Sequence, residues 1–188
     1  MSAEALLVPF GVLERNRGST AIGQPLFLFG RSKETGDFTA DGLECWWEER
    51  KALYPGVDRL HIELDNGPEI GSSRTQFMKR LVEFADRHRV GVELVYPPPY
   101  PSKYNPVERC WGILEKHWNG ALLDSVEQVL NWAGTMTWRA IHPLVRQITS
   151  TYERGVRVSK AEFRPIAERL IRSATLPKWS RGFSHNNR

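Results

Sequence analysis

Two acidic residues stand at positions from which a chain commonly presents a carboxylate to a metal ion. Asp65 ends the strand-like run RLHIELD, in which apolar and polar residues alternate, and Asn66-Gly67-Pro68 then breaks the strand. Glu108 stands in the first turn of an expected helix that has Asn105 as its N-cap and Pro106 at its first helical position. Carboxylates that meet at one edge of a sheet can share Mg2+, which prefers oxygen ligands.

Each of these acids also has a simpler interpretation. Asp65-Asn66-Gly67 is compatible with an ordinary tight turn, since Asx-Gly sequences favour turns. Glu108 follows Asn105 by three residues, so it could complete a capping box. The alternative acids near the same segments are Glu69, Glu93 and Glu115, and the alternation around Glu93 predicts a solvated side chain.

The elements that must position these residues alternate between strands and helices. Apolar runs predict strands at 6–14, 25–30 and 90–96, the first two forming a hairpin, and alternation of apolar and polar residues predicts the strand at 59–64. Helical spacing and capping patterns predict helices at 37–53, 73–89, 106–118 and 142–153, and two more helices that begin near residues 125 and 159. The helix at 37–53 is expected to begin with Asp37 as its cap. Its apolar face should contain Leu43, Trp46, Trp47 and Leu53. The inward face of the helix at 73–89 should contain Phe77, Leu81, Phe84, Ala85 and His88. His88 is expected to be a packed structural histidine.

Composition places the chain among globular proteins. It has 188 residues, of which 40% are apolar and 11% aromatic, and no apolar run of membrane-spanning length or signal-peptide pattern occurs. Cys45 and Cys110 are the two cysteines, each beside a tryptophan, and they are expected to be reduced residues of a cytoplasmic protein.

The C-terminal part is basic. Residues 154–188 contain nine Lys and Arg against Glu162 and Glu168, a balance that favours a phosphate-backbone partner. A solvated charged tail that binds nothing in particular is the alternative. Gly112, one helical turn after Glu108, costs roughly 1 kcal/mol relative to alanine in a helix. It could leave room for a metal ion or the DNA backbone, or it could permit close helix packing.

The segments LDNGPE, SSRTQFMKRLVEFADRH and PPPYPSKYNPVERCWGILEKHWNG resemble the catalytic core of bacterial insertion-sequence DDE transposases of the ISAzo-type group, which is allied to mariner-like elements. The resemblance covers about residues 10–179, and its most specific part is PPPYPSKYNPVERCWG. It implies an α/β, RNase H-like mixed sheet flanked by helices. It also implies three acidic residues that hold two Mg2+ ions (Mn2+ being a substitute), with Asp65 as the second acid and Glu108 as the third.

The first acid of the family has no counterpart on an apolar strand here. Asp37, Asp41 and Asp58 are the aspartates that precede Asp65, and they fall at a helix start, inside a helix and in a turn. The resemblance therefore implies a chain truncated at its N-terminus and a sheet without its first, central strand. Such a sheet would leave the hairpin and the Asp65 strand with unpaired edges, unless residues 6–14 substitute for the absent strand.

The resemblance implies an incomplete DDE catalytic core at 1–120 and a helical, basic extension at 121–188. The expected function is Mg2+-dependent cleavage and strand transfer of insertion-sequence DNA in the bacterial nucleoid, by a homo-oligomer when active. With two of three ligands the chain should be weak or inactive alone. The expected DNA contacts are Lys103, Tyr104, Arg109, Arg164, Arg169 and Arg172. A non-catalytic DNA-binding remnant or regulator of an insertion sequence is the first alternative, and a host RNase H-like nuclease is the second.

Overall fold

The computed structural model describes residues 7–14, 23–64, 67–71, 73–96, 106–172 and 180–183. The chain divides into two compact units, each made of two separated stretches of sequence. Unit 1 contains Met1–Lys33 and Ser102–Tyr152, and unit 2 contains Glu34–Pro101 and Glu153–Arg188. These are units of spatial compactness, and the functional division at residue 120 stays a prediction.

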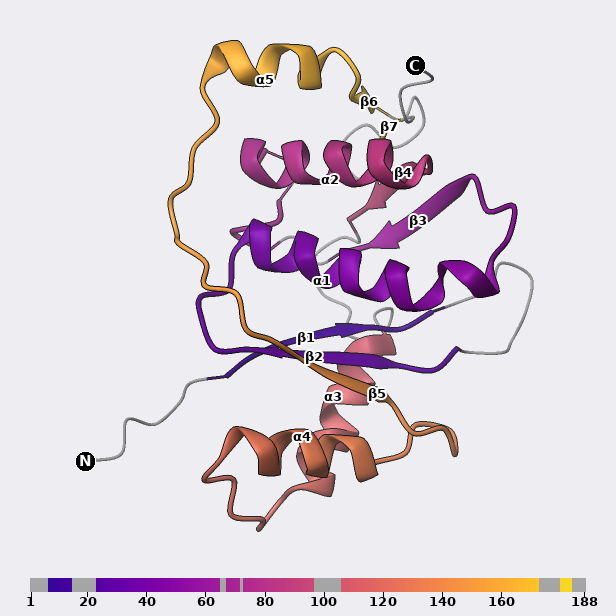
Figure 1. Ribbon diagram of the computed structural model, residues 1–188, viewed down its shortest axis with the longest axis vertical. Helices are drawn as coiled ribbons and strands as arrows, with labels where there is room; N and C mark the ends of the chain where they lie inside the picture. The colour runs from indigo at the N-terminus through magenta and orange to yellow at the C-terminus, as the bar shows by residue number, and fades with distance from the viewer. Residues whose placement is uncertain are drawn as a thin grey trace. The chain divides into compact units, whose positions relative to one another are not determined.

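Unit 1 is a three-stranded sheet with two helices packed on it (Figure 1). Strands β1 (Val8–Val12) and β2 (Leu26–Gly30) form the predicted antiparallel hairpin, and β5 (Leu144–Ile148) pairs parallel with the other edge of β2. Helices α3 (Pro106–His117) and α4 (Val126–Thr135) supply the rest of the core. In this core Phe27 and Phe29 of β2 meet Cys110, Leu114, Val129, Ala133 and Met136, all of them buried.

The strand β5 replaces a predicted helix at 142–153. The apolar residues Leu144, Val145 and Ile148 have a spacing compatible with a helix turn, so local periodicity gave the wrong period. The open edge of β2 supplies backbone partners that local sequence cannot reveal. The Leu144 amide donates to the Pro25 carbonyl at 2.8 Å, and the register then continues along both strands. Tertiary pairing therefore overrides the local pattern.

Unit 2 has a four-stranded sheet in the order β3-β4-β7-β6. Strands β3 (Arg59–Glu63) and β4 (Gly91–Val95) are parallel, as expected for strands joined by the helix α2 (Thr75–His88). Strand β7 (Ser180–Phe183) runs antiparallel to both β4 and β6 (Ile171–Arg172). The remaining elements are α1 (Gly36–Arg50), the short 3-10 helix η1 (Lys51–Leu53) and α5 (Lys160–Ala167).

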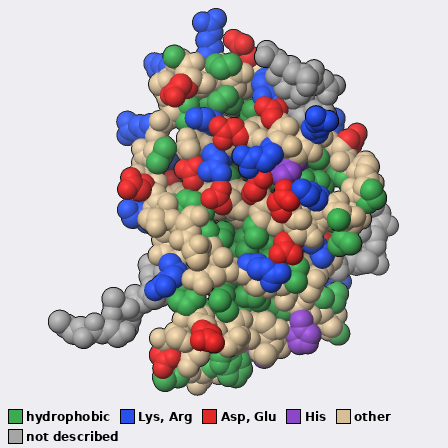
Figure 2. All heavy atoms as spheres, in the orientation of Figure 1, with side chains coloured by type: hydrophobic (Ala, Val, Ile, Leu, Met, Phe, Trp, Pro, Cys, Tyr) green, Lys and Arg blue, Asp and Glu red, His purple; other side chains and the backbone are tan. Residues whose placement is uncertain are grey.

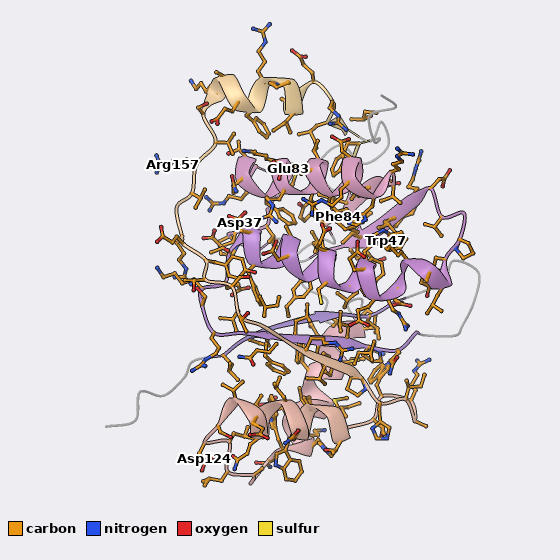
Figure 3. All side chains as sticks on the ribbon, in the orientation of Figure 1. Asp37, Trp47, Glu83, Phe84, Asp124 and Arg157 are labelled. Atoms are coloured by element: carbon orange, nitrogen blue, oxygen red, sulfur yellow. The ribbon has the colours of Figure 1, made fainter. Side chains whose placement is uncertain are left out.

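Helices α1 and α2 contact each other (Figure 3), and the predicted apolar residues within each helix are buried. Trp47 of α1 is 4% exposed and Phe84 of α2 is 2% exposed. Two details of α1 differ from the prediction. Thr35, not Asp37, is the N-cap, because its hydroxyl accepts a hydrogen bond from the Phe38 amide at 3.1 Å. Leu53 is 61% exposed rather than buried, because the α-helix ends at Arg50 and the chain tightens into η1.

The predicted fold class, a mixed α/β fold with helices flanking the sheets, is confirmed, and the arrangement is consistent with an RNase H-like fold. The C-terminal part contains the predicted helices α4 and α5, together with β5, β6 and β7. Within the described ranges, β1 pairs only with β2 and β3 pairs only with β4, so each lies at the edge of its sheet. Strand β1 therefore does not take the central position proposed for residues 6–14.

Candidate active site

The helix that carries Glu108 is fixed on the sheet of unit 1 by one tryptophan. Trp111 stacks on Phe27 with ring centroids 4.5 Å apart and meets Phe29 edge-on at 6.4 Å. Gly11 of β1 makes room for this ring, since a Cβ built there would lie 2.7 Å from Trp111 Cζ2. Cys110 and Leu114, on the same side of α3, are fully buried. Aromatic stacking and a close backbone approach thus set how α3 presents its residues.

Glu108 lies in the first turn of α3, and Pro106 is the first helical residue, as predicted. The side chain is exposed, and its carboxylate has no hydrogen bond or ion pair with any described residue. The capping-box alternative depends on Asn105, which lies outside the described residues. A negative charge near a helix N-terminus interacts favourably with the helix dipole. It is therefore a donor that fits a hard divalent cation.

Asp65 and Asn66 lie outside the described residues, but the strand that leads to them is well defined. The Leu64 amide donates to the Val95 carbonyl at 3.0 Å, which extends the β3–β4 pairing to the residue just before Asp65. Because β3 and β4 are parallel, their C-terminal ends lie at one edge of the sheet. Asp65 belongs to unit 2 and Glu108 to unit 1, and the meeting of their carboxylates stays a prediction.

Asp37 and Asp41, two of the aspartates that precede Asp65, are both bound by one arginine. Arg80 Nη1 donates to Asp37 Oδ1 at 2.8 Å, and Arg80 Nη2 donates to Asp41. Burial lowers the pKa of Arg80, but the hydrogen bonds to the two carboxylates outweigh that effect and leave the pKa raised. These aspartates hold α1 and α2 together, and their carboxylates already have a cationic partner. Asp58 is exposed in the segment before β3.

The alternative acids differ in their surroundings. Glu115 is exposed on α3, and Glu69 lies half-buried in the turn before α2. Glu93 is not simply solvated as predicted, because its side chain is 31% exposed and lies 3.3 Å from His61 Nδ1 on the neighbouring strand.

The residues predicted to contact DNA fall into three groups. Lys103 and Tyr104 lie outside the described residues, and Arg172 ends β6 with a side chain that also lies outside them. Arg109 on α3 and Arg164 on α5 are exposed, and the Arg164 side chain is 83% exposed with Glu168 at 3.5 Å.

Arg169 differs from Arg164 because it forms a bidentate pair with a carboxylate of another helix. Its Nη1 and Nη2 donate to the two carboxylate oxygens of Asp86 at 2.8 Å and 2.6 Å. The hydrogen bonds to Asp86 raise the pKa of Arg169 in spite of partial burial. Such a bidentate pair fastens the end of α5 to α2 and competes with any phosphate.

One further group of potential ligands was not singled out from the sequence. Glu44 and Glu48 of α1 and His88 of α2 bring ligand atoms within 4.8 Å of one another. His88 is packed, as predicted, with its side chain 5% exposed and Nε2 2.7 Å from Glu44 Oε1. Arg87 and Lys51 already pair with the two carboxylates, at 2.9 Å and 2.6 Å. The group is therefore an ion-pair network between helices, which the i, i+4 spacing of the glutamates could have indicated.

This network belongs to a broader band of mixed charge over α1 and α2, visible in Figure 2 as interspersed acidic and basic side chains. None of the described helices combines the length and hydrophobicity needed to cross a bilayer.

Residues 1–184 match a family model described as the Rhodopirellula transposase DDE domain. No curated protein and no solved structure matches the chain at a significant level.

Proposed function

This chain belongs to the family of Rhodopirellula transposase DDE domains, and on that premise we propose that it cuts and joins insertion-sequence DNA with divalent cations held by Asp65 and Glu108. The observation that carries the proposal is the Glu108 carboxylate. It is exposed, unpaired with described residues, and carried by a helix that Trp111 locks onto a sheet. A ligand on a fixed helix suits phosphoryl transfer, in which catalysis depends on positioning and charge stabilisation.

In the proposed reaction, the acidic and the basic residues have different roles. Asp65 and Glu108 would hold the cations, Mg2+ being the preferred ion. When bound, such cations activate a water or 3′-hydroxyl and stabilise the leaving oxygen. Exposed cationic side chains such as Arg109 and Arg164 would hold DNA phosphates in register. A homo-oligomer on DNA in the bacterial nucleoid is the assembly in which we propose this chemistry occurs.

We propose further that the chain alone is a weak catalyst. Two of the three aspartates that precede Asp65 are bound to Arg80, so neither Asp37 nor Asp41 is available as a third metal ligand. Magnesium demands near-octahedral coordination, and two carboxylates hold it less firmly than three.

Metal binding provides the first test, because it does not require turnover. Mn2+ titrations followed by electron paramagnetic resonance should show at least about tenfold weaker binding in Asp65→Asn and in Glu108→Gln, since loss of even an indirect partner costs that much. Glu127→Gln is the matched control, an exposed glutamate in the first turn of another helix, α4, and it should bind Mn2+ as the unsubstituted chain does. Equal Mn2+ affinity in all four proteins would refute the proposed ligands.

Strand cleavage provides the second test. With labelled duplex DNA and Mg2+ or Mn2+, cleavage should be slow and should disappear in Asp65→Ala. Robust cleavage that Asp65→Ala abolishes would contradict the proposal that the chain alone is a weak catalyst, but it would support Asp65 as a residue of the active site. DNA binding that depends on salt yet is indifferent to Asp65→Ala and to metal removal would favour the non-catalytic DNA-binding protein instead. Cleavage without preference for transposon ends would favour the host nuclease.

A further inference from the structure

Gly112 occupies a position in α3 where the packing of the described residues gives no reason for a glycine. The residue lies in the middle of Pro106–His117, and a glycine there lowers helix stability relative to alanine. Cys110 and Leu114, two residues before and after it, are fully buried. At about 100° per residue, Gly112 falls on the side of the helix opposite both. It therefore lies on the side of α3 away from these buried residues, with intermediate exposure of its own.

The space beside Gly112 is open. A Cβ built there meets no heavy atom within 4 Å in the part of the chain that the structure describes. Gly11 shows the contrast, because a Cβ there would press on the Trp111 ring at 2.7 Å. Close packing explains the glycine at position 11. It does not explain the one at position 112, so the helix-packing interpretation of Gly112 has no support among the described residues of unit 1.

The neighbours of Gly112 on the exposed face carry opposite charges on its two sides. Glu108 and Glu115 lie on one side, at about one turn along the helix in each direction. Arg109 and Lys116 lie on the other side, and all four side chains are exposed. Gly112, which carries no side chain, thus lies between two carboxylates and two cations. Polyanions that carry divalent cations match this order of charges, since phosphates attract the arginine and lysine and their cations attract the carboxylates.

We propose that Gly112 is the point where the DNA backbone comes closest to α3, with its phosphates toward Arg109 and Lys116. The missing side chain lets the sugar–phosphate chain lie against the helix, within reach of a cation held by Glu108. Gly112 is then a substrate-positioning residue. This inference rests on the proposed function, in which Glu108 holds a cation at the DNA being cut.

The test uses a size series at this position and the same series at a matched glycine. Gly134 in α4 is also helical, half-exposed and open, with no heavy atom within 4 Å of a built Cβ among the described residues. Alanine and leucine favour helices at both positions, so Gly112→Ala, Gly112→Leu, Gly134→Ala and Gly134→Leu should all unfold at a higher temperature. Binding of a fluorescein-labelled DNA duplex, measured by anisotropy in Mg2+, should separate them. Gly112→Leu should bind roughly tenfold more weakly, the effect of one displaced charge-assisted contact, and Gly112→Ala less so, while both Gly134 variants bind normally.

A stability gain combined with a binding loss cannot come from a merely structural role. Normal DNA affinity in Gly112→Leu would overturn the inference, as would a lower unfolding temperature in Gly112→Ala, which would mean that another part of the protein packs there. The proposed function fails separately. If Glu108→Gln keeps its Mn2+ affinity while Gly112→Leu binds DNA more weakly, the inference about Gly112 is supported and the proposed metal-binding role of Glu108 is wrong. If the unsubstituted chain binds no duplex, both are wrong.

Discussion

Arg80 on α2 donates a hydrogen bond to Asp37 on α1 at 2.8 Å, and the same guanidinium binds Asp41 one turn further along α1. The Arg80 side chain is 26% exposed, and Asp37 is 17% exposed. One residue therefore links two helices and occupies two carboxylates that the sequence leaves available for other roles.

Arg80→Met should lower the free energy of unfolding by about 2 kcal/mol, between the values for exposed and buried ion pairs, because two adjacent carboxylates lose their cation. Urea denaturation measures this change. The control is Arg164→Met, whose pair with Glu168 is 83% and 68% exposed and should contribute within about 0.5 kcal/mol. Equal effects of the two substitutions would show that the link between the helices is not stabilising.

Arg164 and Arg169 should behave differently although both belong to the basic segment. Arg164→Gln should reduce the slope of log affinity for DNA against log salt by about 1, as expected for the loss of one phosphate contact. Arg169→Gln should leave that slope unchanged, because Asp86 holds Arg169 through two hydrogen bonds. Its effect should appear instead as faster hydrogen exchange in α5. A salt slope that falls in Arg169→Gln would mean that DNA displaces Asp86.

Cys110 should be chemically inert in the folded protein. Burial raises the pKa of its thiol to about 12 from an ordinary value of 9.0, so the reactive thiolate is absent at neutral pH. Iodoacetamide at mildly alkaline pH should modify Cys45 first and reach Cys110 only in urea, as mass spectrometry of peptides can show. The shift also has a sign for stability: this thiol favours the folded state below pH 9 and loses that contribution as pH rises toward 12. Rapid labelling of Cys110 in the native protein would contradict its burial.

Gly11→Ala should destabilise unit 1 by about 1–3 kcal/mol, the usual cost of overpacking, because the new methyl group would press on the Trp111 ring. The urea midpoint of unfolding, followed by tryptophan fluorescence, measures the change in stability. Gly182→Ala in β7 is the control, since the nearest atom to its Cβ lies 3.7 Å away. Combining Gly11→Ala with Trp111→Leu should recover part of the loss, and no recovery would mean that the clash lies elsewhere.

Local patterns predicted the parts of the fold that local interactions determine. The apolar run of β2 and the apolar spacing of Phe77, Leu81 and Phe84 required no knowledge of distant residues, and Pro106 marked the start of α3 correctly. The choice of Thr35 over Asp37 as a cap was not predictable in this way, because both residue types cap helices. The Asp37 carboxylate instead accepts a hydrogen bond from Arg80, which belongs to another helix.

For the candidate site, sequence placed Glu108 correctly in the first turn of a helix, and the exit of β3 lies where the sequence predicted it. The role of Asp65 stays a prediction. What sequence could not give is the state of a charged side chain in the fold. Arg169 and Arg164 look alike in the sequence, yet only one of them meets an aspartate from α2 in a two-pronged hydrogen bond.

The parallel pairing of β5 with β2 affects how the chain can fold as it is made. Gln24, just before β2, donates to the carbonyl of His142, 118 residues further along the chain. During synthesis β2 emerges long before β5. One edge of β2 therefore remains without its native partner strand while α1 to α4 are translated. Such distant pairings slow folding and leave a strand open to wrong partners. Because the two compact units are also interleaved along the chain, neither can be released by the ribosome, or cut out by a protease, as one continuous piece.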